Sequence, residues 1–460
     1  MTTTSAHDRS PGVAAQGHRL AEKLSEPFHH LIALLLITLV FGGGGAGEGL
    51  NNLVVQLSAL LVAALNRDAF IRFYRKAPRT LVWLVIASVA LPLVQLVPMP
   101  PAIWSRLPGR EILTEAMELS GGAGWYPISL NWGRTLTAFV GTLAPLTVLV
   151  LCHGLDSRRM DRLIAFLVIA ACAIMLFGSL HVISGLGDLY SDQMSMNGVL
   201  FGTFADRIAA SIFFVSILLL LIAMPWHGVS AMGILVRLCA ALLLFTGTIL
   251  TQSRSGMAAL LVPLAFLAWR ALALLGSRVT AGKAAQINKG LLAGAVVGIV
   301  ALALGAALIL SSGRAQVSLD RFDNGDGGRS DLRDDATVAA ITFWPVGSGM
   351  GTFEDVYQTN EALDHVKTRL VGRAHMDYLE LAVEAGAIGI FLLLVWIYWF
   401  VGAAWRALGS PPDWPARAAI GIVACIAAQS LVAYPLRNQI MLCLTAITVV
   451  LLSRPKAKDA

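Results

Sequence analysis

Arginine side chains stand at the edges of long apolar runs in this chain. Arg207 lies in LFGTFADRIAAS, Arg254 in ILTQSRSGMAAL and Arg437 in LVAYPLRNQIML. Snorkelling at a membrane interface explains any one of them, because the alkyl stem lies along lipid while the guanidinium reaches water. All three arginines are predicted to lie on the outer side of the membrane. This is more than expected, since Lys and Arg normally concentrate in cytoplasmic loops. We interpret them as candidate ligands of one polyanion.

The long polar segment after the ninth apolar run holds further arginines. Arg329, Arg333 and Arg373 lie there. A planar guanidinium makes bidentate, charge-assisted bonds to phosphate that lysine cannot reproduce. The pattern therefore predicts an anionic, lipid-linked substrate at the outer face. We rank Arg373 lowest, as a phosphate or lipid-headgroup contact.

His375 is the candidate for acid–base chemistry. It lies in VGRAHMDYLELAVEAGAIGIF, residues 371–391, where a polar segment gives way to an apolar run. Imidazole titrates near pH 6.5, so its neutral form can accept a proton from a hydroxyl. Asp377, Glu380 and Glu384 follow, the last two at i and i+4 on one helix face. We predict His375 as the base and Asp377 or Glu384 as the group that orients it, with a solvated first helical turn as the alternative for Asp377 and Glu380.

The remaining reactive side chains support no separate site. We interpret His365 as an ordinary polar-face residue and His181 as a hydrogen-bonded residue of an apolar run. The acidic run DRFDNGDGGRSDLRDD lacks the spacing of a calcium loop, and the chain has no HExxH, Walker A or glycine-rich nucleotide motif. The five cysteines include no CxxC pair and are predicted to be packing residues. We expect no metal and no cofactor.

The elements that must position these residues are membrane helices. The chain is 57% apolar and only 13% charged, with a mean hydropathy of +0.72, whereas soluble domains are roughly 25% charged. Apolar runs long enough to cross a bilayer recur along it. We predict an all-α polytopic membrane protein with about twelve spans. They are residues 30–46, 50–65, 80–97, 133–153, 161–184, 207–225, 233–252, 256–274, 290–311, 378–404, 416–435 and 437–453.

Charge distribution predicts the topology. The short loops NRDAFIRFYRKAPR and DSRRMDR are basic, as are SRVTAGKAAQINK and the tail SRPKAKDA, which places both chain ends in the cytoplasm. The N-terminus shows no signal-peptide cleavage site, so the first span is expected to be retained. The net charge of +6 is spread over these loops rather than gathered on one face, which argues against nucleic acid as a partner.

The predicted organisation contains one large outer loop. Cytoplasmic tails at 1–29 and 454–460 flank spans 1–9 (30–311), a loop domain (312–377) and spans 10–12 (378–453). The loop contains the apolar and aromatic runs AAITFWP and GTFEDVY, which disordered linkers lack. We predict a small, mostly helical periplasmic domain over the outer face.

Taken together, the motifs resemble the O-antigen ligase and O-antigen polymerase superfamily of bacterial envelope glycosyltransferases. The motifs are GTFADR at 202–207, TQSRSG at 251–256, WPVGSGMGTFEDVY at 344–357, AHMDYLELAVEAGAIG at 374–389 and SLVAYPLRNQ at 430–439. Their order and spacing match the family from about residue 115 to the C-terminus.

The resemblance implies an inverting, metal-independent transfer of an undecaprenyl-pyrophosphate-linked glycan onto an acceptor, at the periplasmic face of the bacterial inner membrane. His375 matches the family's base, and Arg207, Arg254 and either Arg329 or Arg333 match its pyrophosphate contacts. We add Arg437 to the candidate pyrophosphate contacts. The acceptor is another glycan or lipid A-core, and the sequence does not separate ligase from polymerase. A chain-length regulator or export proteins are candidate partners.

The chain departs from the family pattern at Asp206, Ile208, Met376 and Ala433, where many relatives have Asn, Asn, Asn and Asp. These departures bear on the acceptor contacts more than on the base. A transporter or flippase of lipid-linked glycans is the alternative class. Transporters place polar residues at the bilayer midplane, whereas here the polar residues gather at one face.

Overall fold

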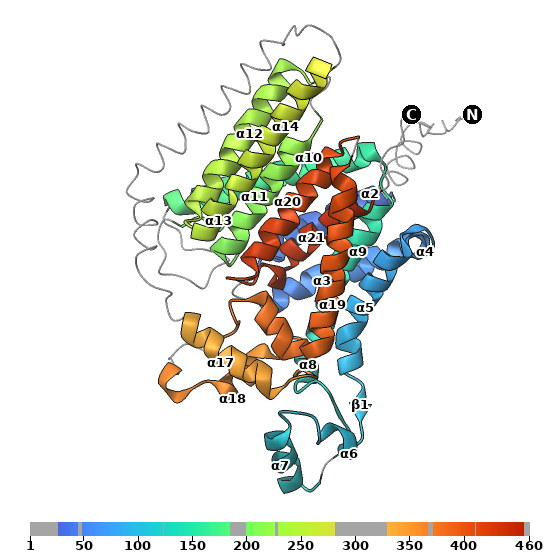
Figure 1. Cartoon of the computed structure of the whole chain (residues 1–460), viewed down its shortest axis with the longest axis vertical. Helices are drawn as coiled ribbons and strands as arrows, with labels where there is room; N and C mark the ends of the chain where they lie inside the picture. Colours follow the sequence, from blue (N-terminus) through green and yellow to red (C-terminus); the bar gives the residue numbers. More distant parts are fainter. Residues whose placement is uncertain are drawn as a thin grey trace, which may run out of the picture.

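The computed structural model describes residues 26–44, 48–122, 124–184, 199–225, 229–280, 329–366, 371–409 and 411–454. Helices dominate this part of the chain (Figure 1). The exception is a short antiparallel pair, β1 (Pro98–Met99) with β2 (Tyr126–Pro127), in which Pro98 faces Pro127 and Met99 faces Tyr126. The predicted all-α class is therefore confirmed for the described residues.

Apolar helices coincide with the predicted spans throughout the described ranges. They are α2 (Pro27–Phe41), α3 (Glu48–Leu65), α5 (Arg79–Gln95), α8 (Trp132–Gly141) with α9 (Leu143–His153), α10 (Ser157–Ser184), α11 (Arg207–Ala223), α12 (Ala231–Leu250), α13 (Arg254–Ala259) with α14 (Leu261–Thr280), α19 (Asp377–Leu408), α20 (Trp414–Gln429) and α21 (Gln439–Ser453). The predicted span at 290–311 lies outside the described residues.

Length and composition support fewer spans than the sequence predicts. Five helical stretches among the described residues are long and apolar enough to cross a membrane: Trp132–His153, Ser157–Ile183, Ala231–Leu250, Arg254–Ala273 and Asp377–Leu408. A sixth is the pair Gly49–Leu65 and Arg67–Lys76, whose second half is α4 and which bends by 76°. The other apolar helices are shorter. The protein is a helical membrane protein, and the count of twelve spans stays a prediction.

Helix α11 forms the centre of the bundle. Every residue from Ala209 to Ala223 is buried, as expected for a helix that is apolar on all sides. It packs against α10, α12, α13, α14 and α20. The core that surrounds it extends through α2, α9 and α21.

Different helix ends and chain segments lie at the two ends of the bundle. At one end, which we call the terminal end, Nη2 of Arg159 lies 3.3 Å from Oε2 of Glu26, and Arg454 donates to the carbonyl of Leu155. The first and last described residues therefore meet at the turn between α9 and α10. At the opposite end, the loop end, α2 terminates and α11, α19 and α21 begin. The first and last described residues thus lie at the same end of the bundle, while the cytoplasmic placement of both chain ends stays a prediction.

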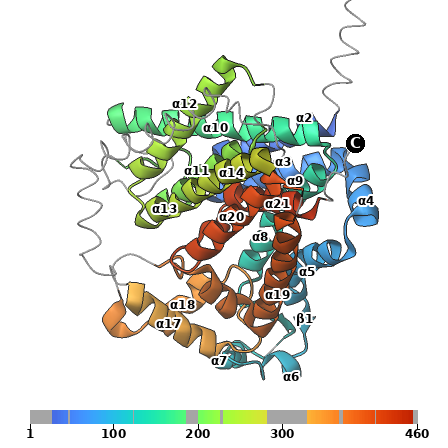
Figure 2. The ribbon, with the colours of Figure 1, turned by 45° about the horizontal axis from the view of Figure 1, so that its top comes forward.

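The described part of the predicted loop domain is helical. It comprises α17 (Arg329–Thr342), α18 (Phe353–Asn360) and the 3-10 turn η1 (Leu363–His365), which lie below the bundle in both views (Figures 1 and 2). These elements enclose a small core of their own that includes Phe343, Phe353 and Tyr357 and reaches Val383 of α19. Residues 312–328 and 367–370 lie outside the described part.

A second segment at the loop end follows α5. It contains α6 (Pro101–Trp104) and α7 (Glu111–Leu119) between the two strands. Arg110 is fully buried there and donates to the carbonyls of Pro108, Ile128 and Gly347. Burial lowers its pKa to about 10. This side chain joins the 98–131 segment to the loop domain.

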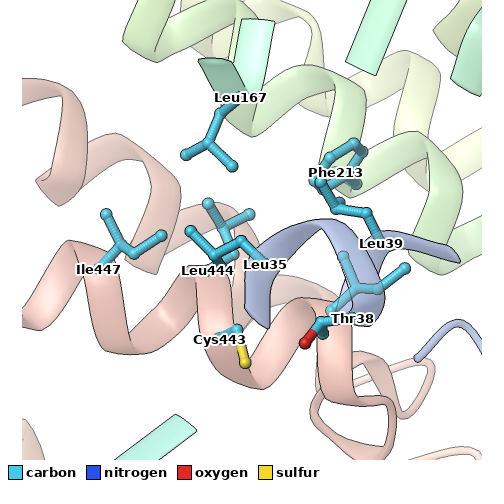
Figure 3. A pocket seen from close by; sticks show the side chains of 9 residues that line it. Leu35, Thr38, Leu39, Leu167, Phe213, Cys443, Leu444 and Ile447 are labelled. Atoms are coloured by element: carbon cyan, nitrogen blue, oxygen red, sulfur yellow. The ribbon is translucent and has the colours of Figure 1, made fainter. Parts of the chain in front are cut away.

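A small apolar cavity lies inside the bundle between α2, α10, α11 and α21 (Figure 3). Its walls are mostly leucine and isoleucine, with Thr38 and Cys443 adding weakly polar atoms. None of the predicted site residues lines it. We therefore treat it as a packing space of the core.

Candidate active site

A glycine turn after α2 joins the two segments that carry Arg207 and Arg437. The carbonyl of Gly43 accepts from the amide of Ala205 (3.1 Å), and the carbonyl of Gly42 accepts from the amide of Gln439 (3.0 Å). A Cβ on Gly43 would lie 1.9 Å from the carbonyl oxygen of Thr203. Glycine is required at this close approach. The run of glycines at 42–45 is typical of a turn, but the sequence does not reveal its place in the site.

Arg207 is the first residue of α11. Asp206 caps this helix, since its carboxylate accepts from the amides of Ile208 (3.1 Å) and Ala209 (3.2 Å). Nη1 of Arg207 donates to the carbonyl of Gln252 at 3.4 Å. The guanidinium therefore reaches the segment that leads into α13.

Arg254 begins α13 beside it. The hydroxyl of Ser253 accepts from the amide of Gly256 (3.1 Å) and caps this helix. A Cβ on Gly256 would lie 2.2 Å from the hydroxyl oxygen of Ser211, so the first turns of α13 and α11 are in close contact. The fold thus places Arg207 and Arg254 at the start of two adjacent helices at the loop end.

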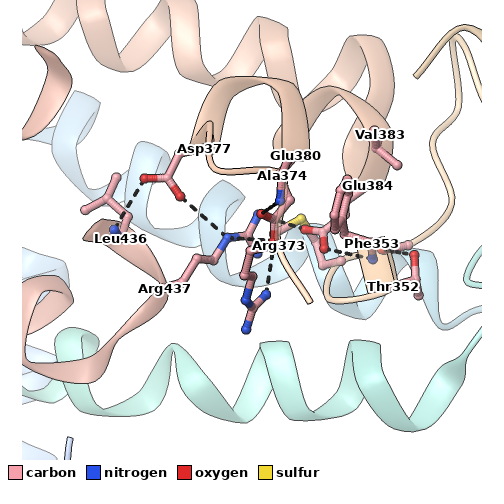
Figure 4. A network of polar contacts seen from close by, with 12 residues as sticks. Thr352, Phe353, Arg373, Ala374, Asp377, Glu380, Val383, Glu384, Leu436 and Arg437 are labelled. Carbon is pink, nitrogen blue, oxygen red and sulfur yellow. Dashed lines mark hydrogen bonds and ion pairs between the residues drawn. The ribbon is translucent and has the colours of Figure 1, made fainter. Parts of the chain in front are cut away.

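Arg437 lies among three carboxylates, which we call the carboxylate cluster (Asp377, Glu380 and Glu384). In the 3-10 turn η2 (Pro435–Arg437), its Nη2 lies 3.0 Å from Oε2 of Glu384 and its Nε lies 3.3 Å from Oε1 of Glu380. Oδ1 of Asp377 is 3.7 Å from Nε. Figure 4 shows the guanidinium directed at these oxygens. The three carboxylates compensate for the partial burial of its positive charge.

Arg373 contributes a second cation to the carboxylate cluster. Its Nη1 lies 3.0 Å from Oε1 of Glu380, whose other oxygen accepts from the amide of Ala374 (3.3 Å). Glu380 and Glu384 are fully buried. Buried carboxylates are stable as ions only when paired and hydrogen-bonded, and the two arginines meet this need.

Asp377 anchors the start of α19. Its Oδ2 accepts from the hydroxyl of Ser430 (2.8 Å) and from the amide of Leu436 (3.3 Å). Its own amide donates to the carbonyls of Ser430 (3.0 Å) and Ala433 (3.3 Å). The SLVAYPLR segment is therefore held against the helix that carries the cluster.

The helix α19 breaks at Gly386, two residues beyond Glu384. Gly386 has φ +53° and ψ −142°, and a Cβ there would lie 2.2 Å from the carbonyl oxygen of Pro345. That carbonyl accepts from the amide of Ala387 (2.8 Å). Non-helical backbone in an apolar helix needs partners from the protein itself, and the WPVGSGMG segment supplies them.

Glu384 is fixed through its backbone as well as its carboxylate. Its carbonyl accepts from the amide of Gly349 (2.9 Å) and from Nε2 of Gln95 (2.9 Å). Oε1 accepts from the amide of Phe353 (3.3 Å). Sequence reasoning missed Gln95, whose only signal is a polar residue at the end of an apolar run. The repeated glycines of VGSGMG are the local signal for the close approach.

His375 lies between the carboxylate cluster and the SLVAYPLR segment. Its φ of +49° falls in the left-handed region that non-glycine residues rarely adopt, and such outliers cluster at functional sites. The side chain is partly buried, and its ring centroid lies 5.0 Å from that of Tyr434 at an interplanar angle of 66°. Tyr434 directly precedes η2, which packs against α11. His375 and Arg207 are thus on connected elements.

The predicted partners of His375 lie in the cluster. Asp377 and Glu384 both contact Arg437, so the side chain that they position is this arginine. Their role in orienting the imidazole stays a prediction. The sequence shows the i, i+4 spacing of the carboxylates, but not that Arg437 folds back onto them.

The loop arginines Arg329 and Arg333 lie in the first two turns of α17, which packs against α19. Arg333 is partly buried, and its Nε atom has no hydrogen-bond partner in the described part of the chain. Of Arg329, only the backbone position at the first residue of α17 is described. The structure thus places the loop arginines on a helix next to the cluster-bearing helix.

His365 forms an ion pair inside the loop domain. Its Nδ1 lies 2.8 Å from Oδ2 of Asp335, which also accepts from the hydroxyl of Tyr357 (3.2 Å). The hydrogen bond to Asp335 raises the pKa of His365. This histidine therefore joins α17 to η1, a more specific structural role than the polar-face position predicted.

Comparison with known proteins finds a family match over part of the chain. Residues 239–394 match the family model described as O-antigen ligase. The matched range contains Arg254, the loop domain, His375 and the carboxylate cluster, while Arg207 and Arg437 lie outside it. No curated protein gives a significant match. The predicted resemblance to the O-antigen ligase and polymerase superfamily is confirmed.

Proposed function

We propose that this membrane protein with an O-antigen ligase domain transfers a glycan from undecaprenyl pyrophosphate onto an acceptor sugar. The observation that carries the proposal is the glycine turn at Gly42 and Gly43, which brings the segment before Arg207 and the segment after Arg437 to one end of the bundle. An arginine pair and a candidate base therefore face the same end. We assign this end to the periplasmic side of the bacterial inner membrane, because the opposite end carries the basic loops.

The donor diphosphate binds Arg207 and Arg254, with Arg329 or Arg333 added from α17. Two guanidiniums at adjacent helix starts offer several charge-assisted donors to a pyrophosphate. The carboxylate of Asp206 accepts from two backbone amides at the start of α11. The prenyl tail then lies along the apolar helices.

His375 acts as the general base. Its imidazole takes the proton of an acceptor hydroxyl while that oxygen attacks the anomeric carbon of the donor. The bond from the anomeric carbon to the diphosphate oxygen breaks, the configuration inverts, and the diphosphate leaves with the electron pair. Base catalysis supplies about 10²- to 10⁴-fold in rate. Positioning and stabilisation of the leaving diphosphate by the arginines supply the rest.

Arg437 is better suited to positioning than to phosphate binding. Together with Arg373 it faces three carboxylates, so these five side chains carry one negative charge in excess. Such a cluster repels a diphosphate but stabilises an imidazolium that forms at His375. We therefore assign Arg437 to holding the SLVAYPLR segment and Tyr434 beside His375.

The test is glycan transfer in membranes supplied with a lipid-linked donor. We expect His375→Ala to lower transfer by about 10²-fold or more while donor binding is retained. His365→Ala is the matched control, because this histidine is engaged with Asp335 in the loop domain, and it should leave transfer near the wild-type level. Equal transfer by both variants would remove His375 from the mechanism.

The same assay identifies the acceptor, and it distinguishes a transferase from a flippase. Lipid A-core and a second lipid-linked repeat are offered separately, and the product identifies a ligase or a polymerase. A flippase would move the donor between leaflets without forming a glycosidic bond. Donor translocation without any product would contradict the proposed transferase.

A further inference from the structure

Helix α4 (Arg67–Lys76) has no part in the proposed mechanism and differs from the other helices. It leaves α3 at a bend of 76° and lies at the edge of the bundle near the terminal end (Figure 1). Its residues Ala69 and Phe73 are buried, and the ring of Phe73 contacts the ring of His153 at 5.2 Å. Within the described part of the chain, one face of α4 is therefore covered.

Part of the apolar face of α4 stays uncovered. Ile71 is 42% exposed and Tyr74 is 51% exposed. On a helical wheel they continue the arc that begins with Phe73 and Phe70. An apolar strip that is broader than the packed contact indicates a second, apolar neighbour.

Cations border this strip. Arg72, Arg75 and Lys76, which we call the α4 basic surface, are exposed, as are the flanking Arg67 and Arg79. Asp68 is the one acidic residue from 67 to 79. Topological orientation needs only basic residues somewhere in a cytoplasmic loop. It does not require that they fold into a helix beside exposed Ile and Tyr.

We propose that α4 is an interfacial helix that binds the anionic phospholipid headgroups of the leaflet at the terminal end of the bundle. The α4 basic surface contacts phosphates of the lipid, while Ile71 and Tyr74 enter the boundary between headgroups and acyl chains. The 76° bend supports this position, because it turns the chain away from the direction of α3. Anionic lipid is chosen over a protein partner because the surface combines a net positive charge with an apolar strip.

The experiment uses the full chain in nanodiscs of phosphatidylcholine alone or mixed with phosphatidylglycerol. Hydrogen exchange of the peptide that covers α4 is measured in both. We expect exchange to be severalfold slower with phosphatidylglycerol. The triple variant R72Q/R75Q/K76Q should lose this difference, and so should the wild type at high salt, because exposed charges are screened. Unchanged exchange of α11 peptides verifies that the variant is folded.

Two control variants make the test specific. Asp68→Asn removes a negative charge from the same helix, whereas the triple variant removes positive charges. It should therefore keep or increase the slowing of exchange by phosphatidylglycerol. Ile71→Ser with Tyr74→Ser should speed exchange in both lipids, because the apolar contribution is lost. Equal exchange of wild-type α4 in the two lipids would overturn the proposal. Protection that appears in native membranes but in neither nanodisc would overturn it in favour of a protein partner.

Discussion

Two arginine-containing regions at the loop end differ in where their arginines lie. In the first, Arg207 and Arg254 start adjacent helices, and the carboxylate of Asp206 caps α11. In the second, Arg437 and Arg373 meet the three acids of the carboxylate cluster. The same residue type therefore serves two purposes. In the proposed function the first region binds the donor diphosphate, whereas in the second region the arginines pair with buried acids.

The difference has an energetic consequence. A buried ion pair contributes little net stability, but loss of one partner leaves a buried charge unpaired. Substitutions in the carboxylate cluster should therefore damage the fold. Substitutions of Arg207 or Arg254 should damage donor binding and leave the fold intact. The predictions below test this contrast, from the largest expected effect to the smallest.

Arg437→Ala should cost about 3–5 kcal/mol of stability, because it removes the arginine that pairs with the fully buried Glu380 and Glu384. Thermal unfolding of the purified protein in detergent measures the loss. Glu354→Ala is the matched control, since its ion pair with Arg134 lies at the partly exposed surface and surface pairs contribute about 0–1 kcal/mol. Equal losses in the two variants would show that the cluster is not structural.

Arg254→Ala should lower glycan transfer by about 10²- to 10³-fold, the range seen when one electrostatic ligand of a transition state is removed. Arg254→Lys should recover only part of this, because the bidentate fork is lost. Both should unfold at the wild-type temperature. Arg406→Ala, at an exposed position near the end of α19, serves as the control. A large drop in unfolding temperature for Arg254→Ala would place this residue with the structural arginines.

Gly43→Ala should disturb both regions together. The new Cβ would meet the backbone carbonyl of Thr203 at 1.9 Å, and overpacking of this kind costs about 1–3 kcal/mol. Transfer and unfolding temperature should fall in the same variant. Gly49→Ala is the control, because a Cβ there meets nothing within 4 Å. Normal transfer by Gly43→Ala would separate the glycine turn from the site.

His365→Gln should have the smallest effect, and it should depend on pH. Asp335 raises the pKa of His365 in the folded protein. The ion pair therefore contributes fully below the unfolded pKa of about 6.5, and its contribution is lost as the pH rises through the higher folded value. The unfolding temperature of the variant should fall below that of the wild type at mildly acidic pH and match it at alkaline pH. A difference that grows with pH would contradict the ion pair.

Much of the fold was predictable from the sequence because its signals are local. Apolar runs indicated the helices that the structure describes, and Arg207 and Arg254 were recognisable as cations at the edges of such runs. The helical character of the loop domain followed from apolar residues within a polar segment. The basic loops and the family motifs are likewise readable without coordinates.

The sequence by itself determined which residues stand at helix ends and which segments are apolar, since hydrophobicity, capping and charge act over a few neighbouring positions. Only the tertiary structure decided the partners. The contact of Gln95 with Glu384 spans 289 residues, and the contact of Arg437 with the carboxylate cluster depends on a glycine turn after the first described helix. Such contacts arise from close packing and from the need to pair buried charges. Both operate through space, so residue spacing along the chain does not reveal them.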